Sequence, residues 1–177
     1  MLKIIVVSDT HKNIALFKRA LEQQKGDILF HLGDNYEDSR DVGFRRYCKS
    51  IYQVPGIYHE GYFSKELEAI IDVEINDWDF TLVHNLEEVD LTTATNRIVF
   101  YGHTHIQKIE QLNNCIVINP GHLKKSTDRG QKASYIVLEV EKELLEIKFY
   151  ELEKGLVKHF KLKKTRDNIM ELNNERS

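Results

Sequence analysis

The sequence predicts a mixed α/β domain in which two β-sheets pack against each other and helices lie outside. Two patterns and one size argument support this class. The first third of the 177 residues alternates short apolar runs with helical spacing, and the second half is rich in short β-type runs. A chain of this length buries roughly 70% of the surface that it exposes when unfolded. We therefore expect a single domain over residues 1–177, with a polar C-terminal tail from about residue 164.

The first third of the chain follows the order β-α-β-α-β. Residues 3–7 and 28–32 are nearly continuous apolar runs, typical of strands buried on both faces, and a third strand is expected at 50–54. Apolar residues recur at helical spacing over residues 14–21, and the polar segment 36–49 is expected to be helical. This alternation predicts parallel strands flanked by helices.

The rest of the chain is expected to add mainly antiparallel strands. Asn76-Asp77 and Asn113-Asn114 separate β-type runs, which predicts two hairpins. We expect a short helix at residues 87–94, and a surface helix or a frayed tail at 164–177. The predicted strands of this part are 68–75, 78–84, 97–101, 108–112, 115–119, 134–140, 144–152 and 156–162.

Composition and charge exclude several classes of protein. With 41% apolar and 30% charged residues, the chain is not disordered as a whole. The net charge of −3 argues against a protein that coats nucleic acid or an anionic membrane. No apolar run approaches the ~20 residues of a membrane span, and polar residues 8–11 interrupt the apolar start before a signal-peptide core forms. Cys48 and Cys115 lack metal-type spacing, so we expect reduced thiols in a cytoplasmic protein.

Residues that commonly bind metals gather where the predicted strands end. Because ligands of α/β proteins bind at the carboxyl ends of strands, we expect these side chains to meet. Mixed nitrogen and oxygen ligands suit Mn²⁺, Fe²⁺, Zn²⁺ or Ni²⁺ better than Ca²⁺. The candidate ligands, in the order of the four strand ends, are Asp9 with His11, then Asp34, then His84, and finally His103 with His105.

Each of these residues, taken alone, also fits a structural role. Asp9 fits a helix N-cap, Gly33-Asp34 fits an ordinary turn, and His84 fits a hydrogen-bonded core histidine. The Gly-His-Thr-His motif at 102–105 is more specific, because two imidazoles beside a glycine rarely serve packing alone. The combination, placed at strand ends, predicts a metal site.

Four segments, in order along the chain, resemble the motifs of calcineurin-like metallophosphoesterases: Asp9-Thr10-His11, Gly33-Asp34, His84 and Gly102-His103-Thr104-His105. The chain size and the Asn119-Pro120-Gly121 turn are similar to the small bacterial and archaeal phosphodiesterase branch, and the resemblance covers roughly residues 1–150. It implies a four-layer α/β/β/α sandwich of two mixed sheets with a two-metal site between their ends.

The resemblance also implies a role for each matching residue. Asp34 would bridge two divalent metals ~3.5–4 Å apart, for which Mn²⁺ is favoured and Ni²⁺, Fe²⁺ and Zn²⁺ are alternatives. A metal-activated water would then attack the phosphorus of a phosphate diester. The first metal would also be held by Asp9, His11 and His105, and the second by His84 and His103.

The segment after the third predicted strand departs from the family. An Asn ligand of the second metal is expected where this chain has Ile57, and isoleucine cannot coordinate a metal. His59, two residues later, leaves three roles open: a replacement ligand, a proton donor or phosphate contact, or a surface residue beside Glu60. We include His59 with Asp34 among the predicted catalytic residues.

Other departures concern histidines around the predicted site. Asn85-Leu86 stands where the family usually has Gly-His, so the site lacks one histidine of the family pattern. Asn85 could still donate a hydrogen bond to phosphate. His122 follows the Asn-Pro-Gly turn where serine is common, and we expect it to be solvated in a loop, with reach into the cleft as the alternative. His31 and His159 lie inside predicted strands and are expected to be structural.

An aromatic cluster, Tyr58, Tyr62 and Phe63, lies beside the altered motif. We expect it to pack against the sheet, with stacking on an aromatic group of the substrate as the alternative.

The leading hypothesis is a metal-dependent phosphodiesterase that acts on a small-molecule or nucleotide-like diester. The alternative is a weak or inactive protein-binding scaffold, as in the retromer subunit that resembles these phosphoesterases, and Ile57 and Leu86 favour it. A nucleic-acid binder without catalysis would need a basic stripe that the sequence lacks. The substrate, monoester hydrolysis, the native metal and a homo-oligomeric state stay open. The number of tightly bound metals discriminates between the enzyme and the scaffold.

Overall fold

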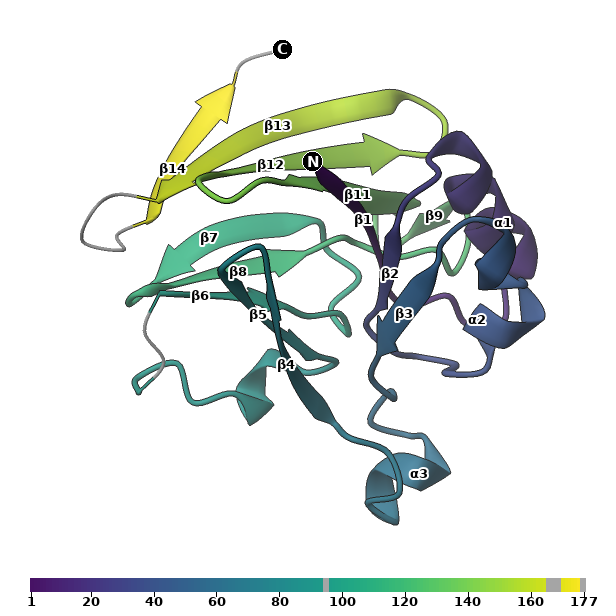
Figure 1. The fold of residues 1–177 in the computed structure, drawn as a ribbon. Coiled ribbons are helices and arrows are strands. Elements are labelled where there is room, and N and C mark those ends of the chain that lie inside the picture. Colours follow the sequence, from purple (N-terminus) through teal and green to yellow (C-terminus); the bar gives the residue numbers. More distant parts are fainter. Residues whose placement is uncertain (94–95, 165–169, 176–177) are drawn as a thin grey trace.

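The predicted architecture of two packed sheets with helices outside is confirmed. The computed structural model describes residues 1–93, 96–164 and 170–175, and Figure 1 shows them as two sheets that face each other, with α1 and α2 beside one of them.

The larger sheet joins N-terminal to C-terminal strands. β1 pairs in parallel with β2, and β2 with β3, while β11 lies antiparallel on the other side of β1. The strand order is β14-β13-β12-β11-β1-β2-β3. The strands are β1 (Leu2–Val7), β2 (Ile28–His31), β3 (Ser50–Gln53), β11 (Ser134–Val140), β12 (Leu144–Glu151), β13 (Gly155–Lys164) and β14 (Met170–Glu175).

The smaller sheet also has a parallel centre, formed by β5, β6 and β8, with antiparallel strands β4 and β7 at its edges. A separate two-stranded hairpin, which the sequence analysis missed, pairs β9 with β10. The strands are β4 (Ile70–Ile75), β5 (Trp78–Val83), β6 (Arg97–Phe100), β7 (Lys108–Leu112), β8 (Cys115–Asn119), β9 (Thr127–Asp128) and β10 (Gln131–Lys132).

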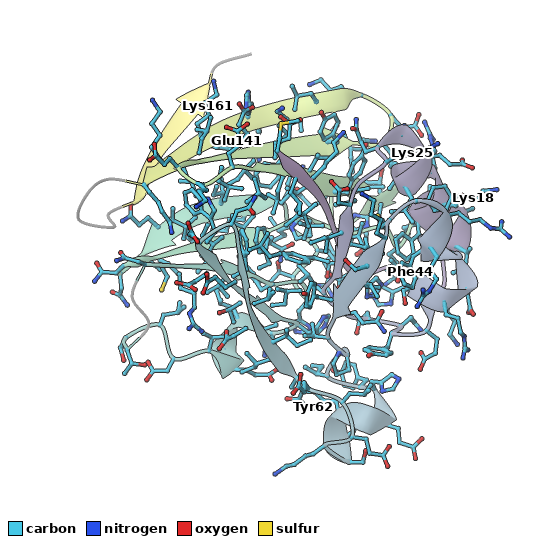
Figure 2. The ribbon with its side chains drawn as sticks, viewed as in Figure 1. Lys18, Lys25, Phe44, Tyr62, Glu141 and Lys161 are labelled. Carbon is cyan, nitrogen blue, oxygen red and sulfur yellow. The ribbon has the colours of Figure 1, made fainter. Side chains whose placement is uncertain are left out.

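Alternation along β1 explains why the molecule has a core on each side of the larger sheet. Ile4 and Val6 belong to the core between the two sheets, whereas Ile5 and Val7 pack against Phe17 of α1. All five side chains are fully buried, and Figure 2 shows side chains filling the space between the sheets. Between the sheets, aromatic rings add to the packing, since the ring centroid of Phe30 lies 5.9 Å from those of Tyr52, Phe80 and Phe100.

The helices are short, and α1 is the longest described. The side chain of Asn13 caps it by accepting a hydrogen bond from the backbone N–H of Leu16 at 3.2 Å. No described helix is long and apolar enough to cross a membrane. The helices are α1 (Ile14–Gln23), α2 (Asp38–Asp41), α3 (Glu60–Phe63) and the 3₁₀ turns η1 (Phe44–Arg46) and η2 (Leu86–Glu88).

The outer face of the smaller sheet is covered by a 3₁₀ turn and a loop. Val83, Val99 and Val117 pack there against Leu86 and Val89, which belong to the segment around η2. This segment forms the fourth layer of the sandwich.

Three expectations about local structure are wrong. The helix expected at 36–49 splits into α2 and η1, because Gly43 adopts φ +67 between them. The helix expected at 87–94 is only the turn η2, and the Asp90 side chain accepts from the N–H of Thr92 at 2.9 Å, which competes with helix formation. A helix or frayed tail is expected at residues 164–177, but residues 170–175 form the strand β14, which pairs with β13 and covers its backbone edge. Residues 165–169 and 176–177 of this segment lie outside the described residues.

Candidate metal centre

The carboxyl ends of the parallel strands of both sheets meet at one place. Asp9 follows β1 and Asp34 follows β2, and the backbone N–H of Asp9 donates to the carbonyl of Gly33 at 3.0 Å. In the other sheet, the N–H of Gly102 donates to the carbonyl of His84 at 3.0 Å, which places the ends of β5 and β6 together. The strand ends thus bring the predicted metal-type residues to one edge of the sandwich.

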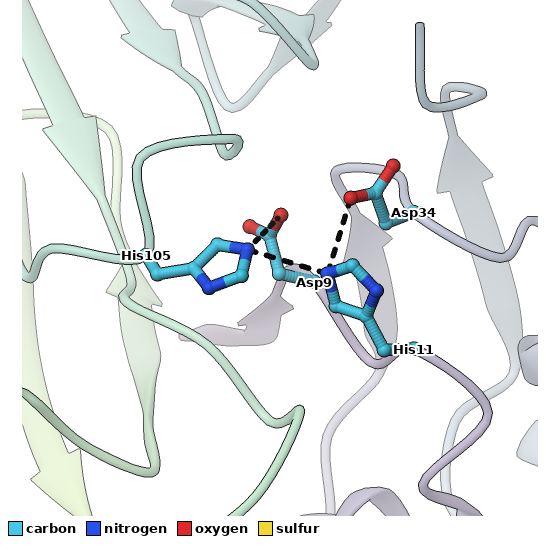
Figure 3. A group of neighbouring side chains, drawn as sticks. All are labelled: Asp9, His11, Asp34 and His105. Carbon is cyan, nitrogen blue, oxygen red and sulfur yellow. Dashed lines mark hydrogen bonds and ion pairs between the residues drawn. The ribbon is translucent and has the colours of Figure 1, made fainter. Parts of the chain in front are cut away.

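Four of these residues form a tight cluster (Figure 3). Asp9, His11, Asp34 and His105 each present a ligand atom, and these atoms all lie within 4.8 Å of one another. His11 Nε2 is 3.2 Å from Asp34 Oδ2 and 3.3 Å from His105 Nε2. His105 Nε2 is in turn 3.1 Å from Asp9 Oδ1. The predicted ligands of the first metal therefore lie together.

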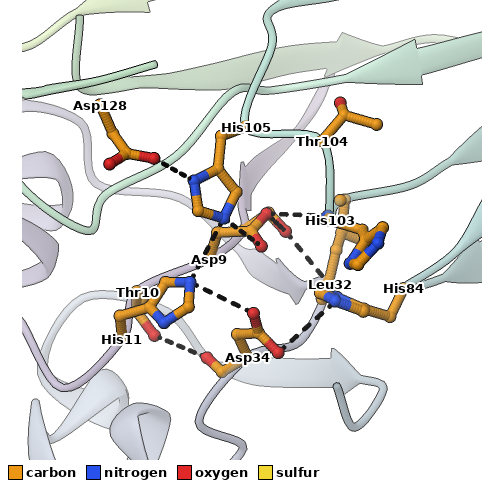
Figure 4. A network of polar contacts seen from close by, with 12 residues as sticks. Asp9, Thr10, His11, Leu32, Asp34, His84, His103, Thr104, His105 and Asp128 are labelled. Atoms are coloured by element: carbon orange, nitrogen blue, oxygen red, sulfur yellow. Dashed lines mark hydrogen bonds and ion pairs between the residues drawn. The ribbon is translucent and has the colours of Figure 1, made fainter. Parts of the chain in front are cut away.

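His84 and His103 lie on the other side of Asp34 (Figure 4). His84 Nε2 is 3.5 Å from Asp34 Oδ1, and the rings of His84 and His103 meet edge to face with centroids 5.3 Å apart. The backbone N–H of His103 donates to Asp9 Oδ2 at 3.1 Å. The two oxygens of Asp34 thus face different histidines.

The donor set fits divalent cations. His84 Nδ1 donates to the carbonyl of Leu32 at 2.7 Å, so its buried Nε2 presents a lone pair toward the Asp34 carboxylate. Among the described residues, five buried side-chain polar atoms have no hydrogen-bond partner, and two of them, His84 Nε2 and Asp9 Oδ1, belong to this group of residues. Buried polar atoms normally have a partner, and a cation between these lone pairs would supply one.

Charge within the cluster is balanced by its histidines. Burial alone would raise the pKa of Asp34, but His11, His84 and His105 together hold it below its ordinary value. For His105, burial acts to lower the pKa, yet Asp9 and Asp128 raise it overall. In both residues hydrogen bonds and opposite charge together outweigh desolvation.

The backbone that carries the cluster is strained. Asp9, His11, Asp34, His103 and His105 all have positive φ, from +39 to +64. Non-glycine residues rarely adopt this region, and such strain concentrates at functional sites. The side chains are therefore held in place by the surrounding structure.

Small residues and polar contacts support these strained loops. A Cβ on Gly56 would lie 2.1 Å from Asp34 Oδ1, so only glycine leaves room for that carboxylate. Asp38 accepts from Thr10 Oγ1 at 2.6 Å and from the N–H of Lys12 at 2.8 Å, which fixes the loop that carries His11. These contacts orient the loops that carry His11 and Asp34.

His59 lies at the rim of the cluster and not within it. A cavity of about 230 Å³ is lined by six residues that include His11, Asp34 and His59. His59 Nδ1 accepts from the N–H of Gly61 at 3.0 Å, and Nε2 donates to Glu37 at 2.8 Å. Both ring nitrogens are thus engaged in hydrogen bonds outside the ligand cluster.

Two expectations around the site are wrong. His122 is fully buried and not solvated, and its ring packs against His105 with centroids 5.5 Å apart. Tyr58 and Phe63 do not pack against the sheet, since they are 81% and 66% exposed. The expected structural roles of His31 and His159 agree with their contacts, to Thr10 at 3.2 Å and to Glu146 at 2.9 Å.

Sequence reasoning missed three carboxylates that contact residues of the site: Glu37, Asp38 and Asp128. Glu37 and Asp38 follow Gly33-Asp34 closely, so their proximity to the site could have been inferred. Asp128 is a lone acid in a polar loop, and no sequence pattern marks it.

A two-sheet sandwich with imidazoles and carboxylates clustered at its strand ends has the features of a metal-binding α/β protein. The chain belongs to the calcineurin-like phosphoesterase superfamily, because the sequence model of that superfamily domain matches residues 2–143.

Individual relatives agree with this membership. Phosphodiesterase MJ0936 of Methanocaldococcus jannaschii is 26% identical over 142 residues, which cover 68% of this chain and 83% of that protein. The E. coli phosphoesterase YfcE has a similar structure, with a TM-score of 0.67 and 21% identity over 89% of this chain and 98% of that one. Vps29 of Entamoeba histolytica complexed with Zn²⁺ gives a TM-score of 0.64 and 19% identity over 92% and 99% of the two chains. The two structural similarities establish the fold.

Proposed function

We propose that this chain is a metal-dependent phosphodiesterase that hydrolyses a small or nucleotide-like phosphate diester at a two-metal site. One observation carries the proposal. The two carboxylate oxygens of Asp34 face different histidines, with Oδ2 3.2 Å from His11 and Oδ1 3.5 Å from His84. A carboxylate in this position is suited to bridge two cations. The diester specificity is supported by the similarity to a named phosphodiesterase.

In this proposal the cluster divides into two sets of ligands that share Asp34. Divalent metals, with Mn²⁺ favoured, would supply an activated water for attack on phosphorus and would neutralise charge on the phosphate oxygens. Asp9 also accepts from Ser8 Oγ and from the N–H of His103, which fixes its carboxylate relative to both sets. One set is Asp9, His11, His105 and Asp34, and the other is Asp34, His84 and His103.

His59 is proposed to donate a proton to the leaving oxygen. It lines the same cavity as His11 and Asp34, and its Nε2–H is presented to Glu37. A positioned imidazolium is an effective general acid near neutral pH. In this step Nδ1 gives up its contact with the Gly61 N–H and takes a second proton, so that loss of the Nε2 proton to the leaving oxygen leaves a neutral ring.

The two halves of the site are proposed to differ in affinity. The half with Asp9, His11 and His105 has four candidate ligands within 4.8 Å of one another when the shared Asp34 is included. The half with His84 and His103 lacks the expected Asn ligand, because Ile57 occupies that position. Fewer protein ligands leave more positions for water or substrate, so the second metal is expected to bind more weakly.

The test is hydrolysis of bis(p-nitrophenyl) phosphate by metal-stripped protein that is resupplied with Mn²⁺ or Ni²⁺. Asp34→Asn removes the bridging charge and is expected to abolish metal-dependent turnover. Glu146→Gln is the matched control, since the Glu146 carboxylate also contacts an imidazole, that of His159, but lies on β12 and not in the cluster. Turnover that is equal in Asp34→Asn and wild type would contradict the proposal.

A protein-binding scaffold is the second candidate, favoured by Ile57, Leu86 and the structural similarity to Vps29. Counting tightly bound metals per chain separates the two candidates. Absence of turnover together with at most one bound metal would make the scaffold the better account.

A further inference from the structure

The hairpin of β9 and β10 places a buried carboxylate behind His105. Asp128 Oδ2 lies 2.6 Å from His105 Nδ1, and only 7% of the Asp128 side chain is exposed. The hairpin belongs to neither large sheet, and Figure 4 shows Asp128 on the side of the His105 ring opposite Asp9.

The contact defines which ring nitrogen of His105 carries a proton. A carboxylate accepts, so Nδ1 of His105 donates to Asp128, and in the neutral ring that would bind a metal this leaves the lone pair on Nε2. Nε2 then points at Asp9 Oδ1, 3.1 Å away, and at His11 Nε2, 3.3 Å away. The ring therefore turns the nitrogen suited to coordination toward the cluster.

The β9–β10 hairpin makes several contacts with the residues around His105. Asp128 and Gln131 are paired across the hairpin, and the carbonyl of Gln131 accepts from His122 Nε2 at 3.2 Å. The ring of His122 packs on that of His105. Arg129 Nη1 donates to the carbonyl of Thr104, the residue before His105, at 3.3 Å. Both the backbone and the ring of His105 are thus held by one small element.

Two cations lie beside the buried Asp128 carboxylate. Lys125 Nζ is 3.1 Å from Oδ1, and Arg129 Nε is 3.9 Å from Oδ2. A carboxylate that stays ionised is a stronger acceptor for an imidazole N–H than a neutral group.

We propose that Asp128 is a positioning residue that fixes the tautomer and the ring orientation of His105, so that His105 binds a metal through Nε2. The inference rests on the proposed metal-dependent function. Carboxylates behind metal-ligating histidines commonly raise ligand basicity, and their loss typically weakens metal affinity or activity by about 10- to 100-fold.

The first measurement uses the wild-type protein alone. Nitrogen-15 NMR of the imidazoles in the Zn²⁺-loaded protein reports which nitrogen is protonated, with the His105 signals identified by their loss in His105→Gln. Protonated Nδ1 with metal-bonded Nε2 is the expected result. Metal bonded to Nδ1, or a proton on Nε2, would overturn the inference, and this readout does not depend on whether any Asp128 variant folds.

The second measurement is the Zn²⁺ affinity of variants by titration against a competing chelator. Asp128→Asn keeps the size of the side chain but loses the charge, and we expect about 10- to 100-fold weaker binding at one metal. Glu146→Gln, which removes the charge of a carboxylate paired with His159 on β13, should change the affinity less than twofold. A merely structural role would lower the stability of Asp128→Asn while leaving its Zn²⁺ affinity unchanged.

The outcomes separate this inference from the proposed function. If the wild type binds neither Zn²⁺ nor Mn²⁺, the proposed function falls and this inference falls with it. If the wild type binds metal and Asp128→Asn binds it equally well, only the role of Asp128 is overturned.

Discussion

His59 Nε2 donates to Glu37 Oε1 at 2.8 Å while Nδ1 of the same ring accepts from the backbone N–H of Gly61 at 3.0 Å. Because the neutral ring carries one proton, this proton resides on Nε2. The imidazole is also the N-cap of α3, so its orientation is tied to the backbone. The hydrogen bond from His59 in turn holds the pKa of Glu37 below its ordinary value. His59 therefore presents a defined N–H at the rim of the cavity.

The proposed role of His59 predicts that the effect of its loss depends on the leaving group. For a diester with a poor leaving group, His59→Ala should lower kcat by about 10²- to 10⁴-fold, because the departing oxygen needs a proton. For bis(p-nitrophenyl) phosphate the loss should be far smaller, since p-nitrophenolate leaves without one. Steady-state kinetics on alkyl and p-nitrophenyl diesters measure the difference. Equal losses on both substrates would argue instead that His59 contributes to metal or phosphate binding.

Gly56 provides a steric test of the bridging carboxylate. A Cβ at this position would lie 2.1 Å from Asp34 Oδ1, so Gly56→Ala should displace that oxygen and weaken Mn²⁺ binding by tenfold or more, equivalent to ~1.4 kcal/mol. Gly155→Ala is the control, because Gly155 has φ +88 but no atom within 4 Å of a new Cβ. This control should lower the free energy of unfolding by only ~1–2 kcal/mol, because alanine is strained at positive φ, and it should leave metal binding intact. Calorimetric titration with Mn²⁺ compares the two, and normal binding by Gly56→Ala would contradict the proposed position of Asp34.

The sequence was sufficient to predict the fold class and the convergence of ligands, for a specific physical reason. Apolar runs such as residues 3–7 mark strands buried on both faces, and parallel strands of one sheet end at the same edge. Asp9 and Asp34 follow two such strands, so their meeting follows from topology. The approach of His84 from the second sheet needed the family resemblance, because periodicity does not say how two sheets are stacked.

Contacts behind the cluster could not be predicted in this way. Asp128 lies 23 residues after His105, in a two-residue strand whose sequence resembles any polar loop. The burial of His122 depends on the same hairpin folding over it. The exposure of Tyr58 has a similar origin, because Tyr58 lies in the segment that leads into α3. Figure 1 shows that α3 projects away from the two sheets. Each of these features arises from tertiary structure rather than local pattern.

The exposed ring of Tyr58 predicts a preference for aromatic substrates. Tyr58 is 81% exposed and lines the cavity that contains His11 and Asp34, so its face is open to a base or aryl group of a bound diester. Stacking on an aromatic side chain contributes ~1–3 kcal/mol per base, so Tyr58→Ala should raise KM for nucleotide-like diesters about fivefold or more. Phe63→Ala is the control, since Phe63 is 66% exposed but does not line the cavity. A KM for Tyr58→Ala that is unchanged on aryl and nucleotide-like diesters would remove Tyr58 from substrate binding.

His31 predicts a specific loss of stability in mild acid. Burial lowers the pKa of His31 to about 4 from the ordinary 6.5, because the buried ring resists charging. The unfolded chain therefore binds a proton at His31 between pH 6.5 and about 4 while the folded protein does not. Stability from this residue is complete above pH 6.5 and declines as the pH falls toward 4, by up to ~3 kcal/mol at 1.36 kcal/mol per pKa unit. Urea unfolding of metal-free protein at several pH values should show a steeper decline for wild type than for His31→Gln, whose amide does not titrate. All other groups are the same in both proteins, so the difference between the two curves isolates His31, and parallel curves would contradict its assignment as a buried neutral imidazole.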